Sequence, residues 1–238
     1  MANKPLISVV VAAYNEEEDL PKCLGAITSQ NFPKEEYELI VVDNNSVDKT
    51  AEIAKSFGAR VIIEEKQGNT YAISKGMSSA EGDIIAATDA DTIVSSDWLF
   101  VIKDIFKDEK IVAATGTASM NTKNKFFNWF AGDFYKGFVK FNFLLGKPHV
   151  TGFNLAMRKT AFDKIGGVNE KFIMSSDVDL GLRLGKVGKV VFSPRLKAVT
   201  SIRRWEENPL KTFYSYLKSY IYVIWLRKPP PVRQNVVR

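Results

Sequence analysis

Residues 82–91 read GDIIAATDAD, and this stretch decides the fold. Its first part is a short apolar run of the kind that forms a buried strand, and Asp89 and Asp91 follow where the chain leaves that strand. Carboxylates held at the end of a rigid strand are the hard oxygen ligands that Mg²⁺ and Mn²⁺ prefer. The alternative is that the two acidic residues only cap the following helix or turn.

Three strand–helix units precede this strand. In each, an apolar, β-branched run is followed by a segment whose apolar residues have helical spacing. The strands are predicted at 7–13, 37–42 and 60–64, and the helices at 17–29, 48–57 and 70–79. Strands that alternate with helices of this length form parallel βαβ units with right-handed crossovers. The sequence therefore predicts an α/β, Rossmann-like domain with a mostly parallel central sheet flanked by helices.

Polar residues follow three of these strands, at the edge where an open α/β sheet binds its ligands. They are Tyr14-Asn15, Asp43-Asn44-Asn45 and Asp89-Ala90-Asp91. Asp43 can accept hydrogen bonds from the N–H edge of uracil or guanine, and Tyr14 offers a stacking face. Taken singly, Asp43 could equally be a turn residue and Tyr14 a rim aromatic. A carboxylate-lined edge repels phosphate unless a cation intervenes, so we expect a nucleoside diphosphate held through a divalent metal.

The second half of the chain has a looser pattern. Helices are predicted at 97–106, 125–145, 177–184 and 208–226, and strands at 111–117, 151–158 and 189–192. Three consecutive prolines at 229–231 end the last helix, because proline cannot continue it. We expect a catalytic domain over residues 1–205, followed by a C-terminal amphipathic helix and a basic, proline-rich tail over 206–238.

The charge of the chain is unevenly distributed. The 238 residues carry a net charge of +6, but the part from Arg195 onward holds ten basic and two acidic residues, which leaves the preceding part slightly acidic. A phosphate-rich substrate or an anionic membrane surface would meet this basic end. The apolar run at 6–13 is short and followed by acid, unlike a secretory signal, and we expect catalysis to face the cytoplasm.

Two segments outside the Rossmann-like part are rich in aromatic residues. Their members are Phe127, Phe130, Phe134, Phe138, Phe141 and Leu145 in the first, and Tyr214, Tyr216, Tyr220, Tyr222 and Trp225 in the second. Such stripes usually form core, but Tyr and Trp mixed with Lys and Arg also suit an interfacial helix on a bilayer. The second contains Lys218 and is short for a span. We expect interfacial helices at the cytoplasmic face of the cell membrane, with a lipid-linked or glycan acceptor.

Several motifs, in this order along the chain, resemble the family 2 glycosyltransferases with the GT-A fold. They are VVVAAYNE (9–16), VVDNNS (41–46), DAD (89–91), GFNLAMR (152–158), IGG (165–167) and SSDVDL (175–180). The resemblance implies an inverting transfer of a sugar from a UDP- or GDP-linked donor to an acceptor hydroxyl or phosphate. The donor-binding residues it implies are Ala13, Tyr14, Asn15, Glu16, Asp43, Asn45, Gly68, Asp89, Ala90 and Asp91, with Asp89 and Asp91 holding Mn²⁺ or Mg²⁺.

By the same resemblance, Asp177 matches the catalytic base, which deprotonates the acceptor as it attacks. The acidic residue that usually precedes this position is Ser176 here, which keeps Asp179 as the second candidate. The acceptor or phosphate side is expected to comprise Gly152, Asn154, Asp179, Arg203, Arg204 and Trp205. Guanidinium groups bind phosphate in bidentate fashion, although an ordinary solvated basic patch is the alternative for 203–205.

Other classes of protein fit less well. A nucleotidyltransferase would carry a glycine-rich, basic loop after the first strand, whereas residues 13–18 read AYNEEE. A nucleic-acid-binding module would line the sheet edge with basic residues, so we expect no nucleic-acid partner. A catalytically impaired relative that only binds the sugar nucleotide remains an alternative, because of Ser176. The single histidine, His149, and the single cysteine, Cys23, are expected to be structural.

Overall fold

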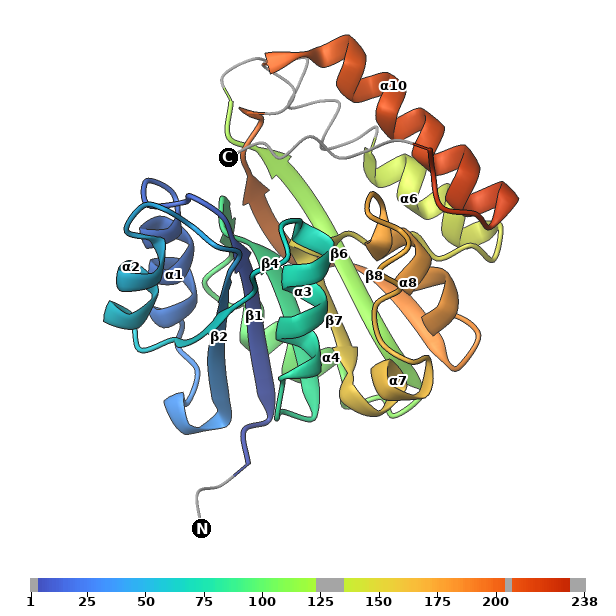
Figure 1. The fold of residues 1–238 in the computed structure, drawn as a ribbon. Coiled ribbons are helices and arrows are strands. Elements are labelled where there is room, and N and C mark those ends of the chain that lie inside the picture. Colours follow the sequence, from blue (N-terminus) through green and yellow to red (C-terminus); the bar gives the residue numbers. More distant parts are fainter. Residues whose placement is uncertain (1–3, 123–134, 204–206, 232–238) are drawn as a thin grey trace.

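The computed structural model describes residues 4–122, 135–203 and 207–231, and its centre is an eight-stranded sheet of order β3-β2-β1-β4-β7-β6-β8-β5 (Figure 1). The strands are β1 Ile7–Ala13, β2 Tyr37–Asp43, β3 Arg60–Ile63, β4 Ile84–Asp89, β5 Thr92–Val94, β6 Ile111–Met120, β7 Leu155–Arg158 and β8 Lys189–Thr200. The α-helices are α1 Leu20–Thr28, α2 Thr50–Ser56, α3 Asn69–Ser78, α4 Trp98–Ile105, α6 Tyr135–Leu144, α7 Lys159–Lys164, α8 Ser176–Leu184 and α10 Pro209–Tyr220. Short 3₁₀ turns are η1 Lys34–Glu36 and η3 Gly152–Asn154, and a π-helical segment, η4 Ile221–Leu226, continues α10.

Strand β1 lies at the centre of the Rossmann-like half and is buried along its whole length. It pairs in parallel with β2 on one side and β4 on the other, and β2 pairs in parallel with β3. Alternate residues of β1 enter two different cores. Val9 and Val11 pack with α1 and α4, whereas Val10 packs with α3 and α8 on the opposite face. A continuous apolar run is what a strand covered on both faces requires, which explains the sequence of β1.

Helix α3 lies directly against this sheet because of Gly76. A Cβ atom at this position would lie 2.5 Å from Cγ1 of Val10 and 2.7 Å from Cγ2 of Val42, so only glycine allows the observed approach. This contact holds α3 close to β1 and β2, and the helix begins after Gly68 at the carboxyl end of the parallel strands.

The other half of the sheet is mixed. Strand β7 pairs antiparallel with both β4 and β6, whereas β6 and β8 are parallel. The predicted strand at 189–192 is much too short, because β8 continues to Thr200 through a register shift between Gly116 and Thr117 of its partner. The end of β8 pairs with β5, a three-residue strand that the sequence pattern did not predict. The predicted strand at 151–158 also begins later, since 152–154 form the turn η3.

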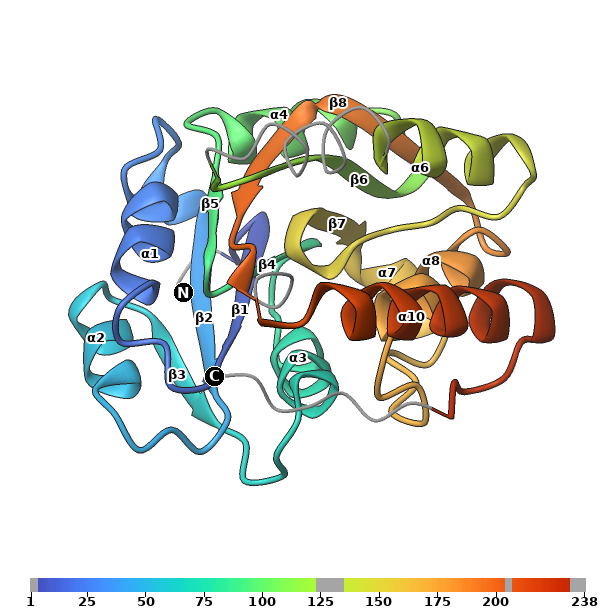
Figure 2. The ribbon, with the colours of Figure 1, turned by 90° about the horizontal axis from the view of Figure 1, so that it is seen from above.

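Helices α6 and α10 both lie above the sheet in Figure 1, and in the view from above α6 lies beside β6 and β8, whereas α10 lies over α7 and α8 (Figures 1 and 2). The hydroxyl of Tyr220 in α10 donates to Asn142 of α6 at 2.8 Å. Beyond α10, Val223 and Ile224 of η4 pack against α8 in a small separate core. The last predicted helix is therefore helical over 209–226, with its final turn widened. The first part of the predicted helix at 125–145 lies outside the described residues.

Candidate active site

The carboxyl ends of β1, β2 and β4 meet in one row, as the polar clusters predicted. In the strand register Ala13 is paired with Asp43, and its neighbour Ala12 is paired with Asp89. Tyr14 follows β1 at the same edge and is partly exposed. Three of the predicted donor-binding segments thus lie side by side.

The loops after β1 and β2 are tied together by hydrogen bonds. The backbone N–H of Asn15 donates to Ser46 Oγ at 3.0 Å, and Asn15 Oδ1 accepts from the N–H of Val47 at 2.9 Å. The N–H of Glu16 donates to Thr50 Oγ1 at 2.8 Å. Asn15 and Asn45 both adopt left-handed backbone conformations, with φ of 53° and 65°, which asparagine tolerates better than most residues. These bonds hold the segment around Tyr14 and the segment around Asp43 in one rigid frame.

Asn44 has a structural role that the sequence did not reveal. Its side chain is buried, and its Nδ2 donates to the carbonyl oxygens of Glu64 and Lys66 at 2.8 Å each. Its Oδ1 accepts from the N–H of Gly68 at 2.7 Å. Asn44 therefore fixes the β3–α3 loop, including the predicted donor residue Gly68, beside Asp43. A single polar residue within a polar turn gives no pattern from which this role could be predicted.

The Asp89-Ala90-Asp91 segment lies between β4 and β5. Ala90 is buried, and the carbonyl of Asp89 accepts from Sγ of buried Cys23 at 3.4 Å, so the segment is anchored to α1. Burial, with the nearby Asp89 and Asp91 charges, raises the pKa of the Cys23 thiol, which keeps it a neutral packing group. Asp91 points outward, with 23% of its side chain exposed.

Within the described ranges no three acidic, histidine or cysteine side chains converge as a complete metal cage. This fits a cation that is held by one or two carboxylates and completed by substrate phosphates, as Mg²⁺ commonly is. Glu16 Oε2, beside Asp91, is buried and has no hydrogen-bond partner among the described residues. A buried carboxylate oxygen without a partner is a position that a cation or its bound water would satisfy. The residues present therefore suit a divalent ion.

Arg203 follows the end of β8 and reaches into this acidic cluster. Its Nη2 donates to Glu16 Oε1 at 2.7 Å and to Asp91 Oδ2 at 3.2 Å, and its Nη1 lies 3.7 Å from Asp19 Oδ2. Burial raises the pKa of Glu16, although the ion pair with Arg203 opposes this effect. The structure thus places Arg203 with the donor-side carboxylates. Arg204 and Trp205 lie outside the described residues.

Asp177, the predicted base, is the second residue of α8 and is partly buried. Its Oδ2 accepts from the N–H of Gly152 at 2.9 Å, and its Oδ1 accepts from the N–H of Val178 at 2.9 Å. Burial raises the pKa of Asp177, against the opposing effect of these two bonds. A carboxylate held by backbone groups, with a raised pKa, is a stronger proton acceptor than an ordinary aspartate.

Asp179 lies in a different environment. Its Oδ2 accepts from Nε of Arg183 at 2.7 Å, and Nη1 of Arg183 donates to the carbonyl oxygens of Ile165 and Gly167. Asp179 therefore positions Arg183, which holds the turn after α7. Because its carboxylate is engaged in this ion pair, Asp179 is less available than Asp177 as a base.

The turn η3 connects Asp177 to the donor edge. Oγ1 of Thr88, directly before Asp89, donates to the carbonyl of Phe153 at 2.9 Å. Gly152 of the same turn holds Asp177, as described above. Asn154 is fully buried: its Oδ1 accepts from Trp98 Nε1 at 2.9 Å, and its Nδ2 donates to two backbone carbonyl oxygens, each at 3.1 Å. Asn154 anchors the turn, and its predicted acceptor contact stays a prediction.

His149 lies behind the acceptor side. Its ring packs edge-on against Tyr135 and Phe138, with centroid distances of 6.2 and 5.5 Å. Burial lowers the pKa of His149 to about 4, so the ring is neutral at physiological pH. The placement is that of a packing residue.

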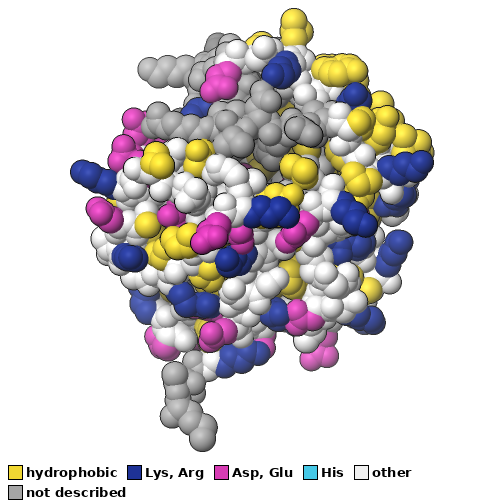
Figure 3. All heavy atoms as spheres, in the orientation of Figure 1, with side chains coloured by type: hydrophobic (Ala, Val, Ile, Leu, Met, Phe, Trp, Pro, Cys, Tyr) yellow, Lys and Arg dark blue, Asp and Glu magenta, His cyan; other side chains and the backbone are white. Residues whose placement is uncertain are grey.

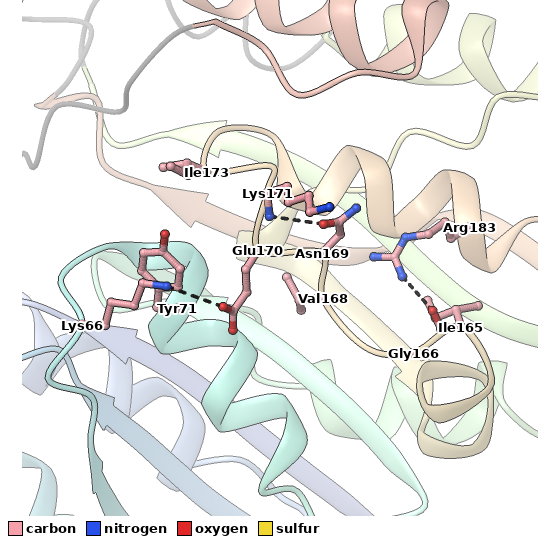
Figure 4. A pocket seen from close by; sticks show the side chains of 10 residues that line it. All are labelled: Lys66, Tyr71, Ile165, Gly166, Val168, Asn169, Glu170, Lys171, Ile173 and Arg183. Atoms are coloured by element: carbon pink, nitrogen blue, oxygen red, sulfur yellow. Dashed lines mark hydrogen bonds and ion pairs between the residues drawn. The ribbon is translucent and has the colours of Figure 1, made fainter.

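A separate open groove of ≈ 830 Å³ lies between α3 and the 165–173 loop (Figure 4). Its lining includes Lys66, Tyr71, Glu170 and Arg183, and Lys66 Nζ lies 3.6 Å from the centre of the Tyr71 ring. The donor and acceptor residues predicted from the sequence are not among its lining residues. It adjoins the site through the β3–α3 loop.

Comparisons with known proteins identify the family of this chain. Residues 8–166 match the family profile described as "Glycosyl transferase family 2". The chain is 42% identical over 101 residues to glycosyltransferase AglE of Haloferax volcanii, covering 40% of this chain and 33% of that protein. It is 32% identical over 195 residues to beta-monoglucosyldiacylglycerol synthase of Nostoc sp., covering 76% of this chain and 41% of that protein. The chain spans less than half the length of both relatives.

Two groups of solved structures share the fold. The mannosyltransferase PcManGT from Pyrobaculum calidifontis, in complex with GDP-Man and Mn²⁺, superposes with a TM-score of 0.74 at 19% identity, covering 96% of this chain and 67% of that chain. TarS of S. aureus in complex with UDP-GlcNAc gives a TM-score of 0.65 at 16% identity, covering 82% of this chain and 58% of that chain. At these identities the likeness establishes the fold alone. With a family match that spans most of the sequence, the chain belongs to glycosyl transferase family 2 and has the GT-A fold.

Proposed function

We propose that this chain transfers a sugar, with inversion, from a UDP- or GDP-linked donor to an acceptor hydroxyl or phosphate, with Mn²⁺ or Mg²⁺ as cofactor. The observation that carries the proposal is the row of Ala13, Asp43 and Asp89 at the ends of three parallel strands, joined through Thr88 and η3 to Asp177. This row supports a nucleoside diphosphate bound at this edge of the sheet, with Asp177 as the catalytic base on the side where the acceptor would approach. Tyr14, Asn15, Asn45 and Gly68 frame the donor in this proposal.

The chain's own residues suit a single displacement. Asp177 accepts the proton of the acceptor hydroxyl while the hydroxyl oxygen attacks the anomeric carbon and the diphosphate leaves. The N–H groups of Gly152 and Val178 hold the Asp177 carboxylate in place. A divalent ion at Asp89 and Asp91 would offset the negative charge that develops on the leaving diphosphate. Complexes of two structural relatives, one with GDP-Man and Mn²⁺ and one with UDP-GlcNAc, support a nucleotide-sugar donor here by analogy.

The test is transfer of a radiolabelled sugar. The chain is incubated with UDP- and GDP-hexoses, Mn²⁺ and a lipid extract that contains glycerolipids and polyprenyl phosphates. We expect label from one donor to enter the lipid phase, and Asp177→Asn to abolish this transfer while it still binds the nucleotide. Nucleotide binding without transfer to any acceptor would contradict the proposed catalysis and favour the catalytically impaired relative.

We also propose that the enzyme works on a membrane surface, with a lipid-linked acceptor. Helix α10 and the first residue of η4 turn their apolar residues outward: the exposed fractions range from 44% to 82% for Leu210, Phe213, Tyr214, Leu217 and Ile221. Their spacing puts them on one face, and Thr212 and Ser219 occupy the buried face instead. This is the reverse of the usual orientation in a water-soluble protein. Trp225, Leu226 and Leu144 extend the exposed set onto η4 and α6.

Positive charge surrounds this apolar surface. Lys211 and Lys218 lie on α10, Arg227 and Lys228 follow η4, and Nζ of Lys147 lies 3.0 Å from the centre of the Trp225 ring. Figure 3 shows hydrophobic side chains gathered at the upper right, where α10 lies in Figure 1, with lysine and arginine among them. No helix in the described ranges is long and apolar enough to span a bilayer. An exposed apolar stripe with cationic flanks suits an interfacial helix on anionic lipid.

Sedimentation with vesicles tests this part. Wild-type chain is expected to pellet with vesicles that contain phosphatidylglycerol and to be released by salt in part. Replacing Leu210, Phe213 and Leu217 together by serine should reduce binding at least about tenfold, since each apolar side chain contributes roughly 1 kcal/mol or more on burial. Phe100→Ser, which removes an exposed apolar side chain of α4 instead of α10, is the control and should bind like wild type. Equal binding by all three proteins would contradict the membrane proposal.

A further inference from the structure

The strongest unexplained contact in the molecule is the bridge that Arg203 makes between Glu16 and Asp91. These residues come from the β1–α1 loop, the segment after β4 and the segment after β8, so three distant parts of the chain meet at one guanidinium. The group is not a surface ion pair: the Arg203 side chain is 29% exposed and that of Glu16 is 10% exposed. Arg203 is a counterion of this acidic cluster.

Three carboxylates of this cluster face two cations among the described residues: Lys22, whose Nζ pairs with Asp19 Oδ1 at 2.9 Å, and the partly buried Arg203. Glu16, Asp19 and Asp91 all lie within 3.7 Å of its two terminal nitrogens. Oε2 of Glu16 is nevertheless buried and without a partner among the described residues, although Oε1 is bonded. One guanidinium therefore leaves a buried carboxylate oxygen unsatisfied, which points to a second positive group at this position.

Arg203 donates to Oδ2 of Asp91, and the Asp91 carboxylate is one of the two that are proposed to bind the metal. A divalent cation and a guanidinium cannot share one carboxylate oxygen at close range without strong mutual repulsion, because unit charges about 4 Å apart interact appreciably even in water. Arrival of a nucleoside diphosphate changes this balance. Its phosphate oxygens offer Arg203 a new bidentate partner and offer the metal additional ligands.

We propose that Arg203 competes with the divalent cation for Asp91 in the free enzyme, so that metal and nucleotide bind tightly only together. The inference rests on the proposed function, since it takes Asp91 as a metal ligand. In this scheme Arg203 is a positioning residue: it lowers the affinity of the free protein for metal, and the diphosphate draws it off Asp91. The coupling must be reciprocal, so metal also raises the affinity for nucleotide.

The experiment measures free Mn²⁺ by electron paramagnetic resonance during titration of the folded protein, first alone and then with saturating UDP or GDP. Arg203→Met keeps much of the side-chain volume and removes the charge, and Arg203→Gln is a second variant should the first not fold. Arg195→Met is the matched control, because Arg195 lies on β8, close to Arg203 in the chain, but pairs with Asp104 on the surface at 2.7 Å. Asp91→Asn reports on the metal site itself, and thermal unfolding checks that each variant is folded.

We expect Arg203→Met to bind Mn²⁺ in the absence of nucleotide at least about tenfold more tightly than wild type, as loss of a nearby unit charge implies for a divalent ion. The gain in Mn²⁺ affinity on adding nucleotide should shrink by a similar factor, and Arg195→Met should match wild type. Unchanged or weaker Mn²⁺ binding by both Arg203 variants, with binding lost in Asp91→Asn, would overturn the competition alone. Mn²⁺ binding that survives in Asp91→Asn would overturn the metal site and the inference with it.

Discussion

Replacing Asn44 by alanine should destabilise the fold far more than an ordinary asparagine substitution. The side chain is 3% exposed and makes three hydrogen bonds of 2.7–2.8 Å, to the carbonyls of Glu64 and Lys66 and from the N–H of Gly68. A typical intramolecular hydrogen bond contributes about 1 kcal/mol net, and buried partners left unsatisfied cost more. We therefore expect a loss of about 3 kcal/mol in the free energy of unfolding. For a domain of this size that corresponds to a fall of roughly 6–12 °C in Tm.

Urea unfolding followed by tryptophan fluorescence and circular dichroism measures this loss. The matched control is Asn208→Ala: Asn208 is exposed and caps α10 through a single bond from the N–H of Lys211 at 3.1 Å. For the control we expect the free energy of unfolding to fall by about 1 kcal/mol, as it does when other helix caps are removed. A loss below about 1 kcal/mol for Asn44→Ala, or one no larger than that of the control, would refute the assignment of Asn44 as the anchor of the β3–α3 loop.

Three further predictions follow from the packing and from the base. Gly76→Ala should destabilise the fold by about 1–3 kcal/mol in urea unfolding, because its Cβ would overlap Val10, and a smaller effect would mean that α3 shifts freely. Trp98→Phe should cost roughly 1–3 kcal/mol in the same assay, because it leaves the buried Oδ1 of Asn154 without its donor. Since burial raises the pKa of Asp177 and the base must be ionised, kcat/KM should fall as pH falls through a pKa above the usual aspartate value of about 3.9. A pH–rate profile without an acid limb above that value would contradict the role of Asp177.

The Rossmann-like half could be predicted closely because its signals are local. The buried run of β1 and the helical spacing at 17–29 each reflect packing against one sheet. The parallel strands end at the same edge, so Asp43 and Asp89 meet there independently of the loop conformations. The family resemblance added Gly152 and Asp177, which the structure joins by a hydrogen bond. Spacing alone could not have paired them, since they are 25 residues apart.

The mixed half was harder to predict because its order comes from long-range pairing. Pro194 interrupts the sequence of β8. Beyond it, buried Leu196 and Ala198 alternate with exposed neighbours over only a few residues, and pairing with β5 and β6 defines this part of the strand. The partners of Arg203 could not be predicted either, because Glu16 is 187 residues away in the chain. The sequence predicted Arg203 as a ligand of the diphosphate or of a phosphorylated acceptor, but it did not predict the ion pairs of Arg203 with Glu16 and Asp91.

The central claim is that Asp91 holds a divalent cation against a nucleoside diphosphate, and isothermal titration with UDP and GDP tests it most directly. Wild-type protein should bind one of the two nucleotides at least about tenfold more tightly with Mn²⁺ than with EDTA, since an ion bridging Asp91 and the diphosphate adds more than 1.4 kcal/mol. Asp91→Asn should bind equally weakly in both buffers. Metal-independent binding by wild type, or Mn²⁺ enhancement that persists in Asp91→Asn, would contradict the account.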